Sequence, residues 1–402
     1  FAVPGALSCA PMTDIVFHDP PRFPRGFRCA SRLAGLKDAG KDLALFVSDV
    51  DAAAAAVFTR NHFPGAPVLV GREIMRGGRL RAVVVNSKVS NVATGERGLE
   101  DVKRMAAAAA AEIDCSADRV LVSSTGVIGV RLPIEKIERG LCGMAGDLQG
   151  DPLVGAAGIM TTDTHPKALS ASVGNATITW VAKGSGMIEP SMATMLSYVF
   201  TDARLDARTL NGMLAEAVRA SFNMLSVDTD TSTSDTCAIL ANGLAGEVSE
   251  PEFQQTLNAG CVRMTEMLAR DGEGATHLIR ATVLGAASEA DARRVAKSLV
   301  NSPLVKTMVH GADPNVGRLL MAVGKCFDCE IRPETTDAWI NGFQVVRAGT
   351  RLDFDDVTVR QALCNDVVDL EVRLGVGDAS ARAYGCDLTK GYIDENAAYY
   401  SS

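Results

Sequence analysis

The sequence predicts an α/β (α+β) fold for this chain of 402 residues. Two observations carry the prediction. Apolar runs of strand length recur along the whole chain, and segments with a helical spacing of apolar residues lie between them. No linker rich in Pro or Ser and no internal repeat interrupts this alternation. At about 150 residues per domain, the length allows two or three lobes.

The strands and helices that carry this prediction can be placed along the chain. Three apolar runs that end in small or polar turn residues are expected strands: 80–87, 119–129 and 176–186. Three segments with apolar residues at helical spacing are expected helices: 101–113, 207–225 and 251–271. Gly272 directly follows the last of these and is expected to end it.

Charge and hydropathy exclude several classes of protein. The 40 Lys and Arg against 48 Asp and Glu give a net charge of −8, and aromatic residues make up only 5%. Nucleic-acid binding needs a basic surface, so this composition argues against it. No run approaches the roughly 20 apolar residues of a membrane span. The alanines of 106–111 are expected within a helix instead.

The ten cysteines are scattered, and we expect mostly reduced, buried thiols. Cys326 and Cys329 form the only C-x-x-C pair, and a single pair without a neighbouring His is weak support for a metal site. The segment before Met12 is too short and too uncharged for an intact signal peptide. Whether it is the remnant of a leader stays open.

Five stretches are rich in glycine and small polar residues, which is typical of loops whose backbone approaches a ligand closely. Each also has a purely structural interpretation, because threonines often satisfy backbone groups at strand ends and Gly-x-Gly is a common turn. The stretches are 123–129 (SSTGVIG), 161–164 (TTDT), 183–196 (KGSGMIEPSMATML), 228–236 (DTDTSTSDT) and 271–279 (DGEGATHLI).

Familiar catalytic motifs are absent: the sequence has no phosphate-binding G-x-x-x-x-G-K-[ST], no G-x-S-x-G and no H-E-x-x-H. Threonine is the abundant candidate nucleophile. A threonine becomes reactive when its own α-amine, with a pKa of about 8, takes the hydroxyl proton. That amine exists only if the chain is cut directly before the threonine. Ala193-Thr194, which follows the glycine-rich 183–186 segment, suits such a self-cleavage.

The 183–196 stretch resembles the signature of the ornithine acetyltransferase family, the bifunctional glutamate N-acetyltransferases. Further segments stand in the family's order between about 120 and 390, and NVATG (91–95) extends the match toward the N-terminus. They are STGVIG, MTTDT, AKGSGM, VDTDTSTSDT, DGEGAT, NSPLVKT, DPN-x-GR and YGCDLT. The resemblance implies a two-lobed α/β fold in which an α chain (1–193) and a β chain (194–402) stay interleaved after autocleavage.

The resemblance also implies roles for individual residues. Ala193 would end the α chain, and Thr194 would be the nucleophile in both cleavage and catalysis. Thr125 and Gly126 would form the oxyanion hole, which stabilises the tetrahedral intermediate. Glu273 would bind an ammonium group or assist proton transfer. The positions that would contact substrate are Thr161, Lys183, Thr194, Glu273, Asn396 and, with a hydroxyl where the family has Thr, Ser401.

The implied reaction is a two-step transfer of acetyl from N-acetylornithine to glutamate in arginine biosynthesis, with ping-pong kinetics and without metal, nucleotide or organic cofactor. Some family members also accept acetyl-CoA. Related proteins assemble as two α and two β chains, or twice that. A cytoplasmic location is expected, or an organellar one in a eukaryote.

Departures from the family's pattern leave the substrate open. His277 stands where Lys is usual, Val316 where Trp is usual, Glu189 and Ser191 where His and Asn are common, and 400–402 ends the chain as Tyr-Ser-Ser. Two alternatives therefore remain. The same threonine could act on another acyl-amino acid or amide, with water as acceptor, or the chain could be an uncut, inactive binding relative.

Overall fold

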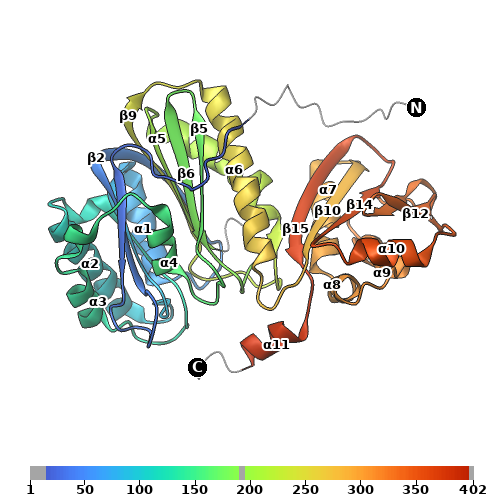
Figure 1. Ribbon diagram of the computed structural model, residues 1–402, viewed down its shortest axis with the longest axis horizontal. Coiled ribbons are helices and arrows are strands. Elements are labelled where there is room, and N and C mark those ends of the chain that lie inside the picture. The colour runs from blue at the N-terminus through green and yellow to red at the C-terminus, as the bar shows by residue number, and fades with distance from the viewer. Residues whose placement is uncertain (1–14, 190–194, 398–402) are drawn as a thin grey trace.

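The computed structural model describes residues 15–189 and 195–397 and shows two lobes, each built on one mixed sheet (Figure 1). The first sheet has the strand order β4-β3-β2-β9-β7-β6-β5, with β1 added beside β2. The second has the order β13-β12-β11-β14-β10-β15-β8. Strands and helices alternate along the chain, so the α/β class expected from the sequence is confirmed.

The first sheet contains every strand before position 247 except β8. The bounds of its strands are β1 Phe27–Arg32, β2 Leu43–Phe58, β3 Arg79–Asn86, β4 Val120–Ser124, β5 Lys167–Val173, β6 Ala176–Lys183, β7 Leu196–Ala203 and β9 Thr236–Gly246. The second sheet comprises β8 Leu225–Ser226, β10 Leu278–Ala286, β11 Asp337–Ile340, β12 Phe343–Arg347, β13 Thr350–Arg351, β14 Val367–Arg373 and β15 Ala379–Cys386.

Helices cover both sheets. The α-helices are α1 Ala66–Ile74, α2 Gly95–Glu112, α3 Ile134–Leu141, α4 Pro152–Ile159, α5 Ala207–Ala220, α6 Glu250–Arg270, α7 Glu289–Asn301, α8 Pro303–His310, α9 Val316–Gly324, α10 Asp356–Leu363 and α11 Lys390–Asn396. Short 3₁₀ turns are η1 Met75–Gly77, η2 Ala117–Arg119, η3 Met144–Asp147, η4 Phe222–Met224 and η5 Pro333–Thr335.

The expected strands and helices are present, with differences in length. The helix expected over 101–113 begins earlier, at Gly95, as α2, and the strand expected within 119–129 ends at Ser124 as β4. The helix expected over 207–225 ends at Ala220 as α5, and a 3₁₀ turn and the two-residue β8 follow. Ser221 accounts for this end, because its hydroxyl donates to the carbonyl of Ala217 at 2.6 Å and its backbone leaves the helical region. Serine side chains commonly compete with the helix in this way.

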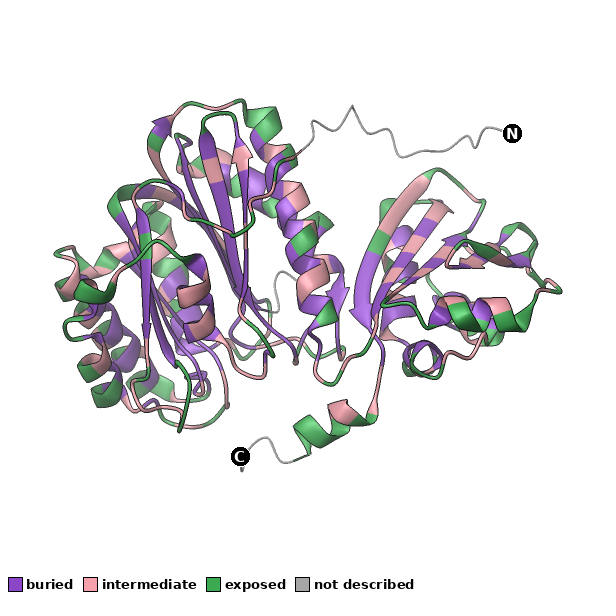
Figure 2. Cartoon of the chain, viewed as in Figure 1, coloured by how far each residue is buried: buried purple, intermediate pink, exposed green. Residues whose placement is uncertain are grey.

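Helix α6 joins the two lobes. It packs against β5 and β6 of the first sheet and against β10 and β15 of the second (Figure 1). Its Gly260 lies directly on the buried ring of Trp180, where a Cβ atom would come within 2.2 Å of the ring. The largest apolar core, which includes Trp180 and Leu278, therefore runs from one sheet to the other through this helix. The strands of the first sheet are mostly buried (Figure 2).

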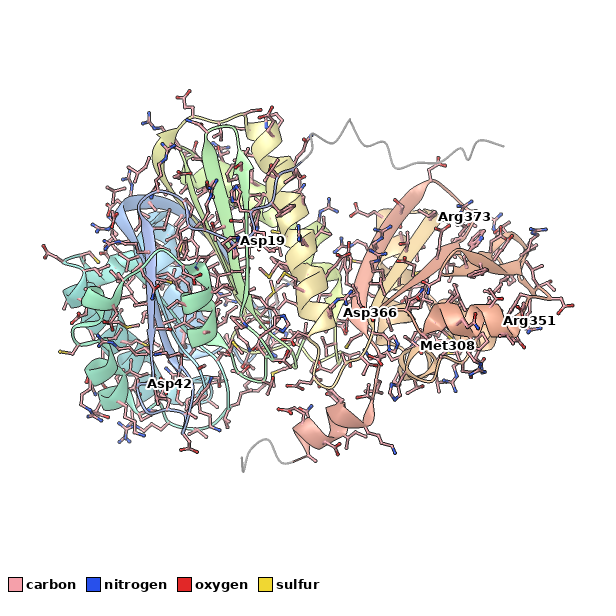
Figure 3. The ribbon with its side chains drawn as sticks, in the orientation of Figure 1. Asp19, Asp42, Met308, Arg351, Asp366 and Arg373 are labelled. Carbon is pink, nitrogen blue, oxygen red and sulfur yellow. The ribbon has the colours of Figure 1, made fainter. Side chains whose placement is uncertain are left out.

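The loops of the first lobe are held by buried polar groups as well as by apolar packing. Asp42, labelled in Figure 3, is fully buried at the start of β2. Its carboxylate accepts the backbone N–H groups of residues 34–37 at 2.6–3.1 Å. Such bonds satisfy the charge of a buried carboxylate and fix the preceding loop.

Strand order places two later strands inside the first sheet. β7 and β9 follow position 194 in the chain, yet they lie between β2 and β6, which precede it. The segment before β9 crosses from the second sheet to the first, because β8 pairs with β15 and β9 pairs with β2 and β7. The C-terminal ends of β4 and β6, the start of β7 and this crossing segment meet at one place.

Candidate active site

The turn after β4 is held in a conformation that needs glycine. Gly126 has φ +126°, and a Cβ atom there would lie 2.2 Å from the carbonyl carbon of Lys88. On either side of this contact, the N–H of Val127 donates to the carbonyl of Lys88 at 2.9 Å, and the N–H of Ser90 donates to the carbonyl of Val127 at 3.0 Å. The loop after β3 therefore fixes Thr125 and Gly126 in place.

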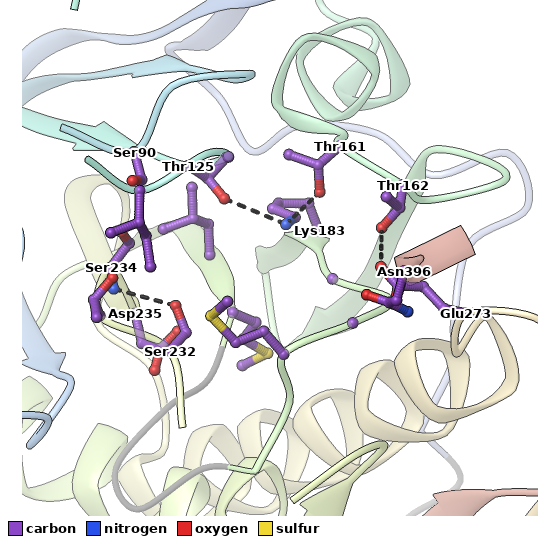
Figure 4. A pocket seen from close by; sticks show the side chains of 18 residues that line it. Ser90, Thr125, Thr161, Thr162, Lys183, Ser232, Ser234, Asp235, Glu273 and Asn396 are labelled. Carbon is purple, nitrogen blue, oxygen red and sulfur yellow. Dashed lines mark hydrogen bonds between the residues drawn. The ribbon is translucent and has the colours of Figure 1, made fainter. Parts of the chain in front are cut away.

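Lys183, the last residue of β6, brings a cation to this turn (Figure 4). Only 7% of Lys183 is exposed, and its ammonium donates to the hydroxyl of Thr161 at 2.7 Å and to that of Thr125 at 3.4 Å. Burial lowers the pKa of Lys183, although the nearby carboxylate of Asp163 opposes the effect. Because an ammonium only donates, the Thr125 hydroxyl keeps its own proton for another acceptor.

A buried ion-pair network lies beside Lys183 and holds the backbone next to it. The carboxylate of Asp163 accepts from Lys167 at 2.7 Å, from the N–H of Gly184 at 2.7 Å and from the N–H of Thr161 at 3.0 Å. Lys167 also donates to Asp271. Burial disfavours the charge of Asp163, but Lys183, Lys167 and the Gly184 N–H outweigh it and hold its pKa at about 2.

A carboxylate lies at the other end of the site. Glu273 accepts from the hydroxyl of Thr162 at 2.7 Å and from the side-chain amide of Asn396 at 2.7 Å, and its N–H donates to the carbonyl of Ser185 at 2.9 Å. Gly186 permits this position, because a Cβ atom there would lie 2.2 Å from the Glu273 carboxyl carbon. Gly186 thus leaves the space that the carboxylate of Glu273 occupies.

One pocket contains the predicted site residues that the structure describes. They come from five separate parts of the chain and are Thr125, Gly126, Thr161, Lys183, Glu273 and Asn396. Ala193, Thr194 and Ser401 lie outside the described residues. Met195 and Leu196, which directly follow Thr194, line the same pocket. The roles expected for these residues remain predictions.

The pocket also contains polar residues that the sequence did not single out. Ser90 comes from the loop after β3, and Thr162 donates a hydrogen bond to Glu273. Asp235 and its neighbouring hydroxyl residues line the pocket just before β9 (Figure 4). The small polar composition of 161–164 and 228–236 marked the right loops. No local signal distinguishes the residues inside them that face the pocket.

The described residues that depart from the family's pattern lie away from the pocket lining. His277 contacts the buried carboxylate of Asp387 at 3.1 Å, and Val316 is a core residue at the start of α9. Glu189 accepts from the amide of Asn301 at 2.8 Å and lies 3.3 Å from the ammonium of Lys297. Ser191 lies outside the described residues.

The described residues hold neither a metal-binding cluster nor a membrane-spanning helix. Among them, no three His, Cys, Asp or Glu side chains are grouped so that they would hold a metal ion. No helix within 15–189 or 195–397 has the length and apolar character to span a membrane.

The two-sheet α/β fold and a pocket that pairs a buried lysine and a carboxylate with several hydroxyls are those of an enzyme for small polar substrates. The chain belongs to the ArgJ family, whose profile matches residues 28–401. The family expected from the sequence is therefore confirmed.

Individual relatives agree with this assignment. The chain is 45% identical to an arginine biosynthesis bifunctional protein ArgJ of Rhodococcoides fascians, over 94% of each chain. It is 42% identical to the glutamate N-acetyltransferase Oat2 of Streptomyces clavuligerus, over 94% of this chain and 98% of that one. The crystal structure of an argJ protein from Bacillus halodurans is 39% identical, with a TM-score of 0.50, and covers 51% of this chain and 100% of its own.

Proposed function

We propose that this chain transfers the acetyl group of N-acetylornithine to glutamate through an acetyl ester on Thr194. Its family makes it an acetyltransferase of arginine biosynthesis. The observation that carries the proposal is the shared pocket. The turn at Thr125 and Gly126, the buried Lys183 and the first residues after Thr194 all line it.

The first half-reaction uses groups at the β4 turn. The Thr194 hydroxyl attacks the acetyl carbonyl while its proton passes to the α-amine of the same residue. The oxyanion accepts hydrogen bonds from the Thr125 hydroxyl and the Gly126 N–H, each worth a few kcal/mol in such sites. The C–N bond of the donor then breaks, and ornithine leaves with the proton that the amine carried.

The second half-reaction reverses these steps with glutamate. Its amine attacks the acetyl ester, the same two donors hold the oxyanion, and the Thr194 oxygen leaves with a proton. Lys183 is suited to the carboxylate that both amino acids share, because its ammonium is buried among hydroxyls. Glu273, held by Thr162 and Asn396, is suited to the ammonium group of ornithine.

The mechanism requires a chain cut between Ala193 and Thr194. We propose an α chain of residues 1–193 and a β chain of 194–402. The length of the Bacillus halodurans chain supports a cut near the middle, because all of it aligns with 51% of this chain. We further propose assembly as two α and two β chains, use of acetyl-CoA as a second donor, and a cytoplasmic location.

Denaturing electrophoresis with N-terminal sequencing tests the proposed cut. The purified protein is expected to give two bands of similar size, one of which begins at Thr194. Thr194→Ala is expected to stay whole and inert while it keeps the native melting temperature. A single unbroken and active polypeptide would contradict the proposal.

Consumption of N-acetylornithine with and without glutamate tests the acceptor. Turnover is expected to depend on glutamate and to give N-acetylglutamate in equal amount. Turnover that is equally fast without glutamate would assign water as the acceptor and make the chain a hydrolase. No turnover by a fully cut chain would assign another acyl donor.

A further inference from the structure

Ser185 lies between the two glycines that follow Lys183, and the steps above do not use it. It is fully buried and does not line the pocket. Its hydroxyl oxygen lies 2.5 Å from the hydroxyl oxygen of Thr162, and its carbonyl accepts the N–H of Glu273 at 2.9 Å. Ser185 therefore holds Glu273 in two ways, directly through its backbone and indirectly through Thr162.

The direction of the hydrogen bonds between these side chains is fixed. A carboxylate only accepts, so the Thr162 hydroxyl gives its single proton to Glu273, at 2.7 Å (Figure 4). Ser185 must then be the donor in the bond between the two hydroxyls. The other oxygen of Glu273 accepts from the amide of Asn396 at 2.7 Å. Each oxygen thus accepts from one neutral donor and keeps a lone pair for a positively charged ligand group.

The residues beside Ser185 and Thr162 form the other end of the pocket. Lys183 comes two positions before Ser185, and Thr161 directly precedes Thr162. The ammonium of Lys183 donates to the hydroxyl of Thr161 at 2.7 Å. The same two short segments are therefore bonded to each other at the lysine and again at the serine, where Glu273 joins them.

The backbone on both sides of Ser185 is held in place. Before it, the N–H of Gly184 donates to the buried carboxylate of Asp163 at 2.7 Å. After it, Gly186 lies so close to Glu273 that a Cβ atom there would be 2.2 Å from the carboxyl carbon. The buried hydroxyl of Ser185 therefore has a fixed position from which to hold the carboxylate.

Resting on the proposed function, we propose that Ser185 is a positioning residue that determines substrate specificity. Through its carbonyl and through Thr162, it keeps the Glu273 carboxylate at a set distance from the Lys183 ammonium. The pocket then selects an N-acetylated diamino acid whose carboxylate and side-chain ammonium match that distance. N-Acetyllysine is one methylene longer than N-acetylornithine, and N-acetylnorvaline has the same carbon chain without the ammonium.

The test measures kcat/KM with these three donors in the full-length protein. Thr162→Val removes the hydroxyl that bonds to Glu273, a bond to a charged group, so kcat/KM for N-acetylornithine is expected to fall about tenfold. Ser185→Ala removes the donor to that hydroxyl, and a fall of about threefold is expected. Both variants are expected to keep kcat/KM for N-acetylnorvaline within about twofold and to reduce the preference for N-acetylornithine over N-acetyllysine.

Two matched variants serve as controls. Thr179→Val, on β6, also removes a buried hydroxyl, which donates to the carbonyl of Arg22 at 2.6 Å, but Thr179 lies outside the pocket. It is expected to keep native kcat/KM with all three donors. Thr162→Ser keeps the hydroxyl and is expected to retain most of the native activity with N-acetylornithine.

Three results would overturn the inference. An equal loss with N-acetylornithine and N-acetylnorvaline would show that Ser185 and Thr162 only support the fold. Native kcat/KM for N-acetylornithine in both variants would show that the two hydroxyls are not needed. An unchanged preference for N-acetylornithine over N-acetyllysine would show that they do not select the length of the substrate.

Further measurements keep the test decisive. If neither Thr162→Val nor Ser185→Ala reaches the native melting temperature, Thr162→Cys is measured, because a thiol fills similar space and is only a weak donor. If N-acetylnorvaline turns over too slowly to follow, norvaline and ornithine are compared as inhibitors, and only inhibition by ornithine is expected to weaken. Failure of the proposed function would appear in the unaltered protein, as an uncut chain or as missing acetyl transfer. Failure of this inference alone leaves the unaltered protein cut and active.

Discussion

The ammonium of Lys167 lies 2.7 Å from the carboxylate of Asp163 in the interior of the first lobe, and neither side chain is exposed. Asp163 also accepts the N–H of Gly184, the residue after Lys183. A buried pair of this kind is destabilised strongly when one partner is lost. This buried ion pair therefore couples the stability of the fold to the position of Lys183.

The first prediction concerns the stability of this network at low pH. The folded protein lowers the pKa of Asp163 from 3.8 to about 2, so the stabilisation is complete above pH 4 and is lost as pH falls toward 2. The loss is about 2 kcal/mol. Asp163→Asn is expected to cost about 3–5 kcal/mol at pH 7 and to flatten this acid dependence.

Urea unfolding at several pH values between 2 and 7 measures the effect. Asp38→Asn is the matched control, because Asp38 is an exposed carboxylate in the same lobe. It is expected to follow the unaltered protein within about 0.5 kcal/mol. Equal acid dependence in Asp163→Asn and the unaltered protein would assign the loss to other carboxylates.

The second prediction concerns the turn at Thr125 and Gly126, which is the proposed oxyanion hole. Gly126→Ala adds a Cβ atom that would meet the Lys88 backbone at 2.2 Å, at a φ of +126° that other residues rarely adopt. The turn must shift, and kcat is expected to fall about 100-fold or more. Gly150→Ala, where an added Cβ meets nothing within 4 Å, is expected to keep native kcat. Native kcat in Gly126→Ala would exclude this turn from catalysis.

The third prediction concerns helix α11. Asn396→Ala removes the donor that holds Glu273 at 2.7 Å, and the KM for N-acetylornithine is expected to rise about fivefold because one hydrogen bond of about 1 kcal/mol is lost. Steady-state kinetics measures the change. Glu395→Gln alters the exposed neighbour on the same helix and is expected to leave KM unchanged. Equal KM values in the two variants would separate α11 from the binding of substrate.

Several site residues could be predicted from the sequence because each lies in a short segment of unusual composition. Lys183 and Glu273 are examples, and the structure places them in one pocket. The pairing of Lys167 with Asp271 could not be predicted, since the two residues lie about a hundred positions apart and their contact depends on burial. Asp235 could not be predicted either. The composition of 228–236 indicates a loop, but only the fold shows that Asp235 is a buried group in the pocket wall.

The fourth prediction addresses the unusual His277. The sequence left open whether this change from the family's Lys alters the choice of substrate. His277 bonds to Asp387 and does not line the pocket, so His277→Lys is expected to keep both KM values within about twofold. Thr161→Val, which removes the partner of Lys183, is expected to raise them about tenfold. A changed preference in His277→Lys would place that side chain against substrate during turnover.

The last prediction follows from the order of strands in the first sheet. A cut before Thr194 separates β2 and β6 from β7 and β9, yet β9 pairs with β2 from Phe58 to Ala53, and β7 pairs with β6. Separation would break two ladders and expose the apolar core on both faces, so the fragments are expected to remain together. Size-exclusion chromatography of the cut protein should give one native peak that yields two bands under denaturing conditions. The uncut Thr194→Ala variant should elute at the same volume. Fragments that part without denaturant would contradict this pairing.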